Sequence, residues 1–212
     1  MDAGSLASGA GLPSLLLARA RSVRMLGLAG APGAGKSTLA RALAMAVPGA
    51  VVVPMDGFHL TTSRLTELGR VERRGAVDTF DAQAYVALLR KIRQQRESVS
   101  APGFDRTREE PVPAAISVAP DAPLVVTEGN YLLLDDPPWS AVRTVLDEVW
   151  FVEIPESLRV QRLIERFVAY GMDRAAATER VRTGSDAVNA RLVAATRDRA
   201  DIVVSPSGEL RV

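Results

Sequence analysis

Residues 30–38 match the pattern G-x-x-x-x-G-K-[ST] of a phosphate-binding loop, which constrains this chain more than any other feature. The motif consists of Gly30, Ala31, Pro32, Gly33, Ala34, Gly35, Lys36, Ser37 and Thr38. Its glycines allow positive φ angles, so successive backbone amides can turn inward around an anion. We therefore expect a nucleoside triphosphate, with Lys36 at the β- and γ-phosphates and the Ser37 hydroxyl on Mg²⁺.

The residues on either side of the motif support this interpretation. Residues 25–29 are a short apolar run and residues 39–47 are rich in Ala and Leu, which predicts a strand before the loop and a helix after it. The phosphates would then lie at a helix N-terminus, where unpaired amides favour negative charge. The chain has two lysines, Lys36 and Lys91, against 24 arginines, and one of the two occupies the position that needs an ammonium. A glycine-rich turn that matches by chance would not explain this context.

Apolar and amphipathic segments alternate along the rest of the chain. The apolar runs that predict buried strands are 50–54, 124–128, 148–154 and 201–204, and the segments that predict helices are 12–21, 78–96, 155–170, 175–181 and 189–197. This alternation predicts a single α/β domain whose parallel sheet is covered on both faces, with ligands beyond the carboxyl ends of the strands. The segment 98–113 is expected to be a long functional loop.

Composition excludes several classes of function. The net charge is +1 and no long block of like charges occurs, which argues against a nucleic-acid partner. Cysteine is absent and His59 is the only histidine, so we expect no disulfide and no zinc site, and a reducing cytoplasmic location fits. The leucine-rich patch at 12–17 is short and lacks a basic flank, so we expect no signal peptide and no membrane span.

Two acids follow predicted strands and could take part in chemistry. Glu128 ends an apolar run, where a carboxylate can reach the Mg²⁺ shell directly or through water. Asp56 follows the run 50–54 and precedes Gly57, which lets the backbone pass close to a ligand. There it could orient a substrate hydroxyl and accept its proton. The alternatives are a solvated acid for Glu128 and a turn-capping role for Asp56.

Arginines supply a second group of candidates. Arg159, Arg162 and Arg166 are spaced i, i+3 and i+7 in a predicted helix, so they share a face that could close over a triphosphate. A solvated arginine stripe is the alternative. A further group could meet an anionic substrate or cover a surface helix, and it comprises Arg64, Arg70, Arg73 and Arg74.

Five motifs together resemble one family. They read GAPGAGKST, MDGFHL, DTFDAQAY, PGFDRTREEPVP and EGNYLLLDDPPW, and the chain from about residue 24 to residue 204 resembles the phosphoribulokinase, uridine kinase and bacterial pantothenate kinase superfamily. Within it, the chain is similar to a bacterial branch of nucleoside kinase-like or fructose-transport-system kinase-like proteins. The resemblance implies a P-loop NTPase three-layer α/β/α fold with a helical lid at about 155–185. It also implies one kinase domain at 24–212, after an extension and leading helix at 1–23.

The resemblance also implies an activity and a site. It implies ATP and Mg²⁺, transfer of the γ-phosphoryl group to a hydroxyl of a small metabolite, and a dimer or tetramer as a common assembly, so that a homodimer is possible here. Asp56 would be the base, with Lys36 at the phosphates, Ser37 and Glu128 near the metal, and Arg162 and Arg166 in a mobile lid. The residues that it implies for the acceptor pocket are Asp56, Phe58, His59, Phe104, Asp105, Arg106 and Tyr131.

The chain departs from the family pattern in two places. Phe167 stands where this branch is expected to carry a histidine, and Val77, rather than a proline, precedes the segment 78–81. A nucleoside or sugar is the first expected acceptor and a pantothenate-like alcohol the next. An ATPase or regulatory nucleotide-binding protein without transfer activity is the alternative. A nucleotide monophosphate kinase is less favoured, because Asp56 would repel an acceptor phosphate.

Overall fold

A six-stranded sheet carries the fold in the computed structural model, which describes residues 12–94, 96–205 and 210–211. The sheet order is β2-β5-β1-β6-β7-β8. The strand bounds are β1 Met25–Ala29, β2 Val51–Pro54, β5 Val125–Gly129, β6 Glu148–Val152, β7 Ile202–Val204 and β8 Leu210–Arg211. The first five strands in this order pair in parallel, and β8 pairs antiparallel to β7. The predicted mainly parallel sheet is therefore confirmed.

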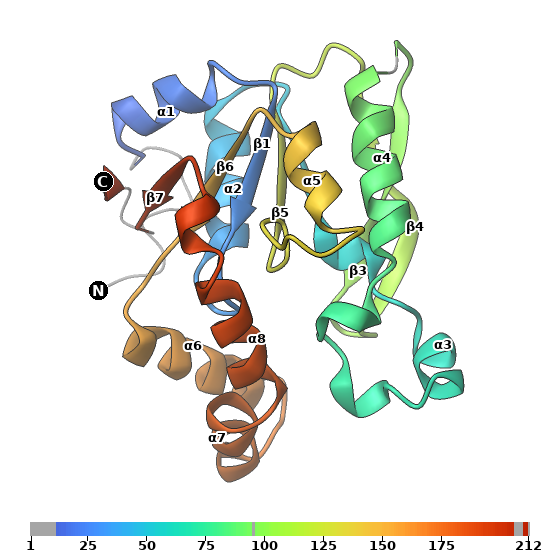
Figure 1. The fold of residues 1–212 in the computed structure, drawn as a ribbon, viewed down its shortest axis with the longest axis vertical. Helices are drawn as coiled ribbons and strands as arrows, with labels where there is room; N and C mark the ends of the chain where they lie inside the picture. Colours follow the sequence, from blue (N-terminus) through green and yellow to red (C-terminus); the bar gives the residue numbers. More distant parts are fainter. Residues whose placement is uncertain (1–11, 95, 206–209, 212) are drawn as a thin grey trace.

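Helices cover both faces of this sheet (Figure 1). Helices α1 (Ser14–Ala20) and α2 (Lys36–Ala46) pack on one face, where they share a core with Leu26 and Leu28 of β1. Helices α4 (Ala82–Gln94), α5 (Ser140–Val145) and α8 (Ser185–Ala194) pack on the other, where the core includes Met25 and Ala29. Successive strand residues point to opposite faces. Every residue of β1 and β5 is buried, which explains the continuous apolar sequence of β1 and of the first part of β5.

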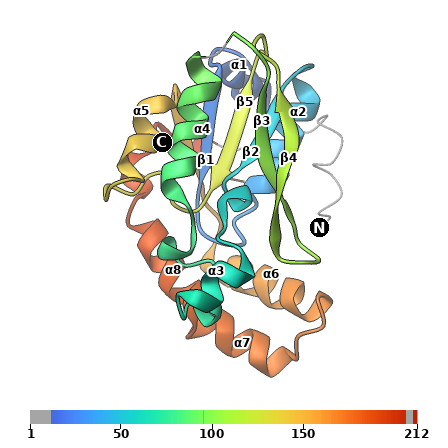
Figure 2. The same cartoon turned by 90° about the vertical axis from the view of Figure 1, so that its right-hand side faces the viewer.

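The remaining elements are helices α3 (Thr62–Glu67), α6 (Glu156–Ala169) and α7 (Arg174–Arg182), the 3-10 helices η1 (Met55–Phe58), η2 (Val71–Arg73), η3 (Val77–Thr79) and η4 (Arg197–Arg199), and the strands β3 (Val99–Asp105) and β4 (Glu110–Val118). Most of them lie toward the carboxyl end of the sheet, whereas the hairpin of β3 and β4 runs along its side next to β2 (Figure 2). Figure 2 shows α3 and α6 at the same end of the molecule as the tip of the β3–β4 hairpin. Helices α6 and α7 span the segment that is expected to form a lid, and we call them the lid helices. They carry a small apolar cluster that consists of Leu163, Ile164, Ala177 and Val181.

The loop predicted at 98–113 is wrong, because β3 and β4 form an antiparallel hairpin there. Val99, Ala101 and Gly103 are buried in alternation, as a half-covered strand requires. Prolines disguise this pattern in the sequence. A register shift between Ala101 and Gly103 accommodates Pro102, and the prolines of β4 lie in a strand that pairs on one side only.

Other differences are smaller. Helices α3 and α5 were not predicted, and α8 begins at Ser185 rather than at 189. The first half of the predicted extension, residues 1–11, lies outside the described residues, whereas Leu16 and Ala20 of α1 are buried against the sheet. Among the described residues, no helix combines the length and apolar character needed to cross a membrane.

Candidate active site

The phosphate-binding loop connects β1 to α2 and has the backbone that its glycines predict. Gly30, Gly33 and Gly35 have φ angles of 148°, 84° and 98°. A β-carbon at Gly30 would lie 2.6 Å from the carbonyl oxygen of Val152, and one at Gly33 would lie 2.8 Å from Cγ of Leu163. The loop is therefore packed so closely that only glycine fits at both positions, and its concave side remains lined by backbone.

Lys36 is the first residue of α2 and is buried, with 7% of its surface exposed. Its ammonium donates hydrogen bonds to the carbonyl oxygens of Gly30 at 2.8 Å and Ala31 at 3.1 Å, and to Oδ1 of Asn130 at 2.8 Å. Burial lowers the pKa of Lys36 to about 8, against the opposing effect of Glu128. The lysine is therefore held within the loop, where phosphate oxygens would be its replacement partners.

Glu128 and Ser37 meet beside the lysine. The Ser37 hydroxyl donates a hydrogen bond of 2.8 Å to Oε1 of Glu128, which lies on β5 next to β1. Burial, and then the charge of Asp56, raises the pKa of Glu128. A hydroxyl and a carboxylate are hard oxygen donors, and Mg²⁺ in phosphate sites commonly uses one or two such protein ligands together with phosphates and water. The described residues contain no group of three or more potential ligands among His, Cys, Asp and Glu. A metal ion held by Ser37 and Glu128 would therefore take its other ligands from phosphates and water.

Asp56 lies in η1, directly after β2, and β2 pairs with β5 so that Pro54 is opposite Glu128. Its Oδ2 accepts a hydrogen bond of 2.7 Å from Arg106, which lies at the tip of the β3–β4 hairpin. The hairpin approaches η1 so closely that a β-carbon at Gly57 would lie 2.5 Å from the carbonyl oxygen of Pro102. The structure thus brings the two acids identified from the sequence to the same edge of the sheet.

His59 connects Asp56 to an aromatic cluster. Its Nδ1 donates a hydrogen bond of 2.8 Å to the Asp56 carbonyl oxygen, and its ring lies 4.0 Å from the ring of Phe80 and 4.8 Å from that of Phe104. Burial lowers the pKa of His59, so the imidazole is neutral at pH 7. Phe104 is half-buried, whereas Phe58 is 7% exposed and packs edge-on against Tyr85 in the core.

Two other residues from the expected acceptor pocket have structural partners. The Asp105 carboxylate accepts hydrogen bonds from the amides of Thr107 and Arg108, at 2.8 and 3.1 Å, and so shapes the hairpin turn. Tyr131 is fully buried and its hydroxyl donates to the carbonyl oxygen of Gly75. Asp105 and Tyr131, like Phe58, therefore stabilise the structure around Asp56 through contacts within the protein.

The three arginines of α6 differ in their surroundings. Arg159 is buried and bonds to both carboxylate oxygens of Glu156 and to the carbonyl oxygen of Pro32, so it fixes α6 to the phosphate-binding loop. This corrects the expectation of a shared arginine face. Arg162 is exposed. Desolvation, and then repulsion by Arg106, lowers the pKa of Arg166, whereas Asp186, Tyr170 and then Asp56 raise it. Arg166 is exposed, and the charges of Arg106 and Asp56 at the site act on it together with that of Asp186 in α8.

The sequence analysis missed two residues of this site. Asn130 holds the ammonium of Lys36, and Phe80 stacks on His59. Asn130 had a usable signal, since it is a polar residue that follows a buried strand by one position and lies two residues after Glu128. Phe80 lies just before the start of α4, where nothing in the sequence distinguishes it. Its contact with His59 depends on the isolated β-bridge between residues 59 and 80, which leaves no local sequence pattern.

The fold and the site define a class of protein. A mainly parallel sheet, a phosphate-binding loop after its first strand and carboxylates after two neighbouring strands are the parts of a P-loop phosphotransferase. The family model of the Phosphoribulokinase / Uridine kinase family matches residues 25–211, and the chain belongs to this family. The resemblance inferred from the motifs is therefore confirmed.

Relatives agree with this assignment. A Schizosaccharomyces pombe protein named "Putative uridine kinase" is 35% identical over 159 residues, 70% of this chain and 68% of that protein. The uncharacterized protein YggC of Escherichia coli is 34% identical over 186 residues, 85% of this chain and 76% of its own. A crystal structure titled "putative fructose transport system kinase", from Silicibacter sp. TM1040, matches with a TM-score of 0.79 and 39% identity over 85% of this chain and 88% of that one. The chain is thus a phosphotransferase of the kinase class, and its P-loop family implies ATP as the donor.

Proposed function

We propose that the protein transfers the γ-phosphoryl group of MgATP to a hydroxyl of a small metabolite: a nucleoside, a sugar or a pantothenate-like alcohol. The observation that carries the proposal is the placement of Asp56 next to Glu128 with one carboxylate oxygen available. Arg106 engages Oδ2, and no hydrogen bond to Oδ1 is formed within the described part of the chain. A carboxylate that merely capped a turn would instead accept from backbone amides, as Asp105 does.

We assign a different role in phosphoryl transfer to each residue around Asp56. Lys36 and the amides of the phosphate-binding loop would bind the β- and γ-phosphates. Ser37 and Glu128 would hold Mg²⁺, which neutralises charge on the phosphates. Asp56 would orient the acceptor hydroxyl and take its proton as the new O–P bond forms, while the bond from the γ-phosphorus to the bridging oxygen breaks and ADP leaves with the electron pair.

Arg166, together with Arg162, would complete the site from the lid helices. An arginine near the transferring group stabilises the charge that develops on its oxygens. The support for this role is electrostatic: the charge of Arg166 lowers the pKa of Lys36, and the charge of Asp56 is one of those that raise the pKa of Arg166. Arg162 has an exposed position on the same helix and no hydrogen bond or ion pair within the described residues, so it can turn toward a triphosphate.

A monophosphate acceptor is disfavoured by the arginines that could have bound it. Arg70 and Arg73 pair with Asp78, at 3.4 and 3.0 Å, and Arg74 bonds to Thr62 and to the backbone of Glu109. These three arginines already have partners within the protein. A hydroxyl acceptor without a phosphate therefore agrees better with the charges around Asp56.

A mass-spectrometric screen tests the proposal. Purified protein is incubated with MgATP and a pooled library of nucleosides, sugars, polyols and vitamins, and the products are searched for a mass gain of one phosphoryl group. The Lys36→Ala variant, which loses the cation at the phosphates, is the control for contaminating kinases. A product formed by the wild type alone supports the proposal and names the acceptor. ATP binding with no product from any pool would favour a nucleotide-binding protein without transfer activity.

A further inference from the structure

Residues 71–80 lead to Phe80, whose ring lies against that of His59, but they have little regular structure of their own. They contain two single 3-10 turns, η2 and η3, separated by Gly75 at a φ angle of 90°. Turns of this kind are weakly stabilised by their own hydrogen bonds. The position of the segment must therefore depend on contacts with the rest of the molecule.

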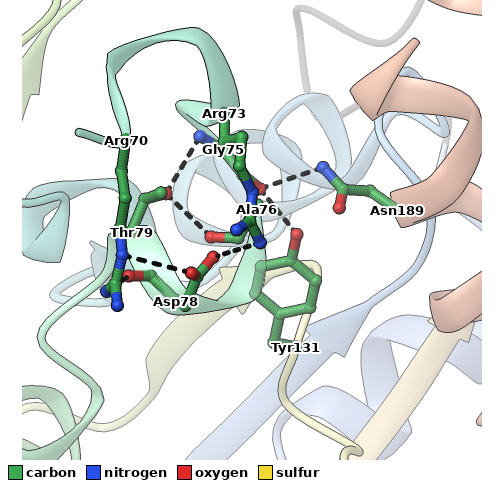
Figure 3. A network of polar contacts seen from close by, with 8 residues as sticks. All are labelled: Arg70, Arg73, Gly75, Ala76, Asp78, Thr79, Tyr131 and Asn189. Carbon is green, nitrogen blue, oxygen red and sulfur yellow. Dashed lines mark hydrogen bonds and ion pairs between the residues drawn. The ribbon is translucent and has the colours of Figure 1, made fainter. Parts of the chain in front are cut away.

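The Gly75 carbonyl oxygen is the point where the segment is held (Figure 3). It accepts a hydrogen bond of 2.6 Å from the Tyr131 hydroxyl and one of 3.0 Å from Nδ2 of Asn189. Both donors are buried, with 0% and 5% of their surfaces exposed. A buried donor that loses its acceptor is costly, so each depends on this carbonyl. Tyr131 follows β5 and Asn189 lies within α8, so one carbonyl joins three parts of the chain.

Hydrogen bonds within residues 75–79 hold the turn around Gly75 together as one unit. The Gly75 amide donates to Oγ1 of Thr79 at 3.0 Å, and the Thr79 hydroxyl donates to the carbonyl oxygen of Ala76 at 2.7 Å. Asp78 forms ion pairs with two arginines that precede the turn. Holding the Gly75 carbonyl therefore places the whole turn.

Contacts lead from this turn to the candidate base. The Leu60 amide donates to the carbonyl oxygen of Thr79 at 2.9 Å, and the adjoining Phe80 ring stacks on His59. His59 in turn bonds to the Asp56 backbone. A shift of the turn would thus reach the residues around Asp56 through direct contacts.

We propose that Asn189 is a positioning residue for the phosphate acceptor. It touches no reacting group. It acts by fixing the Gly75 carbonyl and with it residues 71–80, which in this proposal form a wall of the acceptor site. Because Asn189 belongs to the helix that follows the lid helices, this bond also links the lid side of the site to the acceptor side. The inference rests on the proposed kinase function, in which the wall faces the acceptor rather than ATP.

Hydrogen–deuterium exchange tests the contact without any ligand. In Asn189→Ala, and in the isosteric Asn189→Asp, which lacks the donor, amides of residues 71–80 should exchange faster by at least tenfold, a factor that matches the loss of about one buried hydrogen bond. Tyr131→Phe should have the same effect. The matched control is Thr196→Ala, since Thr196 is buried just after the same helix and donates only to the carbonyl oxygen of Val193. Equal exchange in all variants, or an equal increase in the control, would overturn the proposal.

Kinetics with the acceptor returned by the screen test the positioning role. Asn189→Ala should raise the KM for the acceptor about tenfold, as expected for one lost hydrogen bond, and leave the KM for ATP unchanged. A purely structural loss would raise both constants or lower the amount of active protein. If no acceptor exists, the proposed function fails, while the exchange experiment still decides whether Asn189 holds the wall.

Discussion

Asp56 and Lys36 lie at the same edge of the sheet, and each is held by hydrogen bonds to a different kind of group. The Asp56 carboxylate is paired with a cation on the hairpin, while the Lys36 ammonium is bonded to neutral carbonyl oxygens in its own loop. A substrate that arrives between them must compete with these bonds. Substitutions of Asp56 and of Lys36 should therefore have different effects on phosphoryl transfer and on ATP binding.

The substitution Asp56→Asn should separate transfer from nucleotide binding. The amide keeps the shape of the carboxylate but cannot take a proton at pH 7, so the transfer rate should fall by a factor of about 10² to 10⁴ while ATP binding persists. Product formation and ATP affinity are measured together. Asp81→Asn is the matched control, because Asp81 accepts from the Ala84 amide at the start of α4 and asparagine also serves that role. Full turnover by Asp56→Asn would exclude Asp56 as the base.

The lowered pKa of Lys36 predicts a pH dependence of ATP binding. In the free protein the ammonium loses its proton as the pH rises through about 8, whereas the phosphates of bound ATP require it. Below this pH, binding should take up almost no proton at this site. Above it, binding should take up a proton, and the affinity should fall with rising pH. Calorimetry in buffers of different ionisation enthalpy at pH 7 and pH 9 measures this uptake. Lys36→Arg stays charged and should abolish the difference, and equal uptake at both values would contradict the assignment.

At the scale of elements, the site depends on how closely the β3–β4 hairpin approaches η1. Gly57→Ala should test this contact, because the added methyl group would lie 2.5 Å from the carbonyl oxygen of Pro102. The hairpin must move, and Arg106 with it, so we expect a loss of about 1–3 kcal/mol in stability and a larger loss of transfer activity. Thermal denaturation and product formation measure the two effects. Gly69→Ala, where the methyl group meets nothing within 4 Å but φ is 64°, should lower stability by about 1–2 kcal/mol and leave activity intact.

Helix α6 carries a second testable arrangement. The Phe167 ring lies 5.5 Å from the guanidinium of Arg166 and 4.5 Å from that of Arg180 in α7. Phe167→Leu would keep the apolar packing of the lid helices but remove the π face. The lost attraction predicts a decrease of about two- to tenfold in kcat if the ring orients Arg166. Steady-state kinetics measure the change, and an unaltered kcat would show that Arg166 is oriented without the ring.

How far the sequence could predict this site depended on whether the signal was local. The phosphate-binding loop with Ser37, the position of Glu128 at the end of an apolar run and the apolar strands themselves could be predicted because each lies in a short contiguous pattern. The hairpin was mistaken for a loop because its prolines hide the alternation of buried residues. Arg159 was misjudged because its burial depends on the Glu156 side chain and on the loop carbonyl of Pro32. Contacts across more than a hundred residues, such as that between Asn189 and Gly75, leave no local pattern at all.

At the scale of the whole molecule, the apolar core is divided in a way that favours lid motion. Two clusters lie on the two faces of the sheet, and the third consists of residues of α6 and α7, with Leu163 also lying close to Gly33 of the phosphate-binding loop. A small separate cluster contributes little apolar burial to the main core. We therefore expect the lid helices to change position at a lower cost than the helices on the sheet, with α6 held at Arg159, which bonds to the carbonyl oxygen of Pro32. Gly171 joins the two lid helices with a φ angle of 91°, and a β-carbon there would meet nothing within 4 Å.

This division predicts that MgATP will order the lid helices more than any other part of the protein. Arg162 is exposed in the free protein, and Arg166 lies in the field of the site, so a bound triphosphate would give both a partner. Amide exchange in residues 156–182 should therefore slow on addition of MgATP, while exchange in β1 and β5, already buried, should change little. The Lys36→Ala variant, which binds the triphosphate poorly, should show no such protection. Protection confined to the phosphate-binding loop would mean that the lid helices do not respond to the nucleotide, and the role proposed for Arg162 and Arg166 would then be excluded.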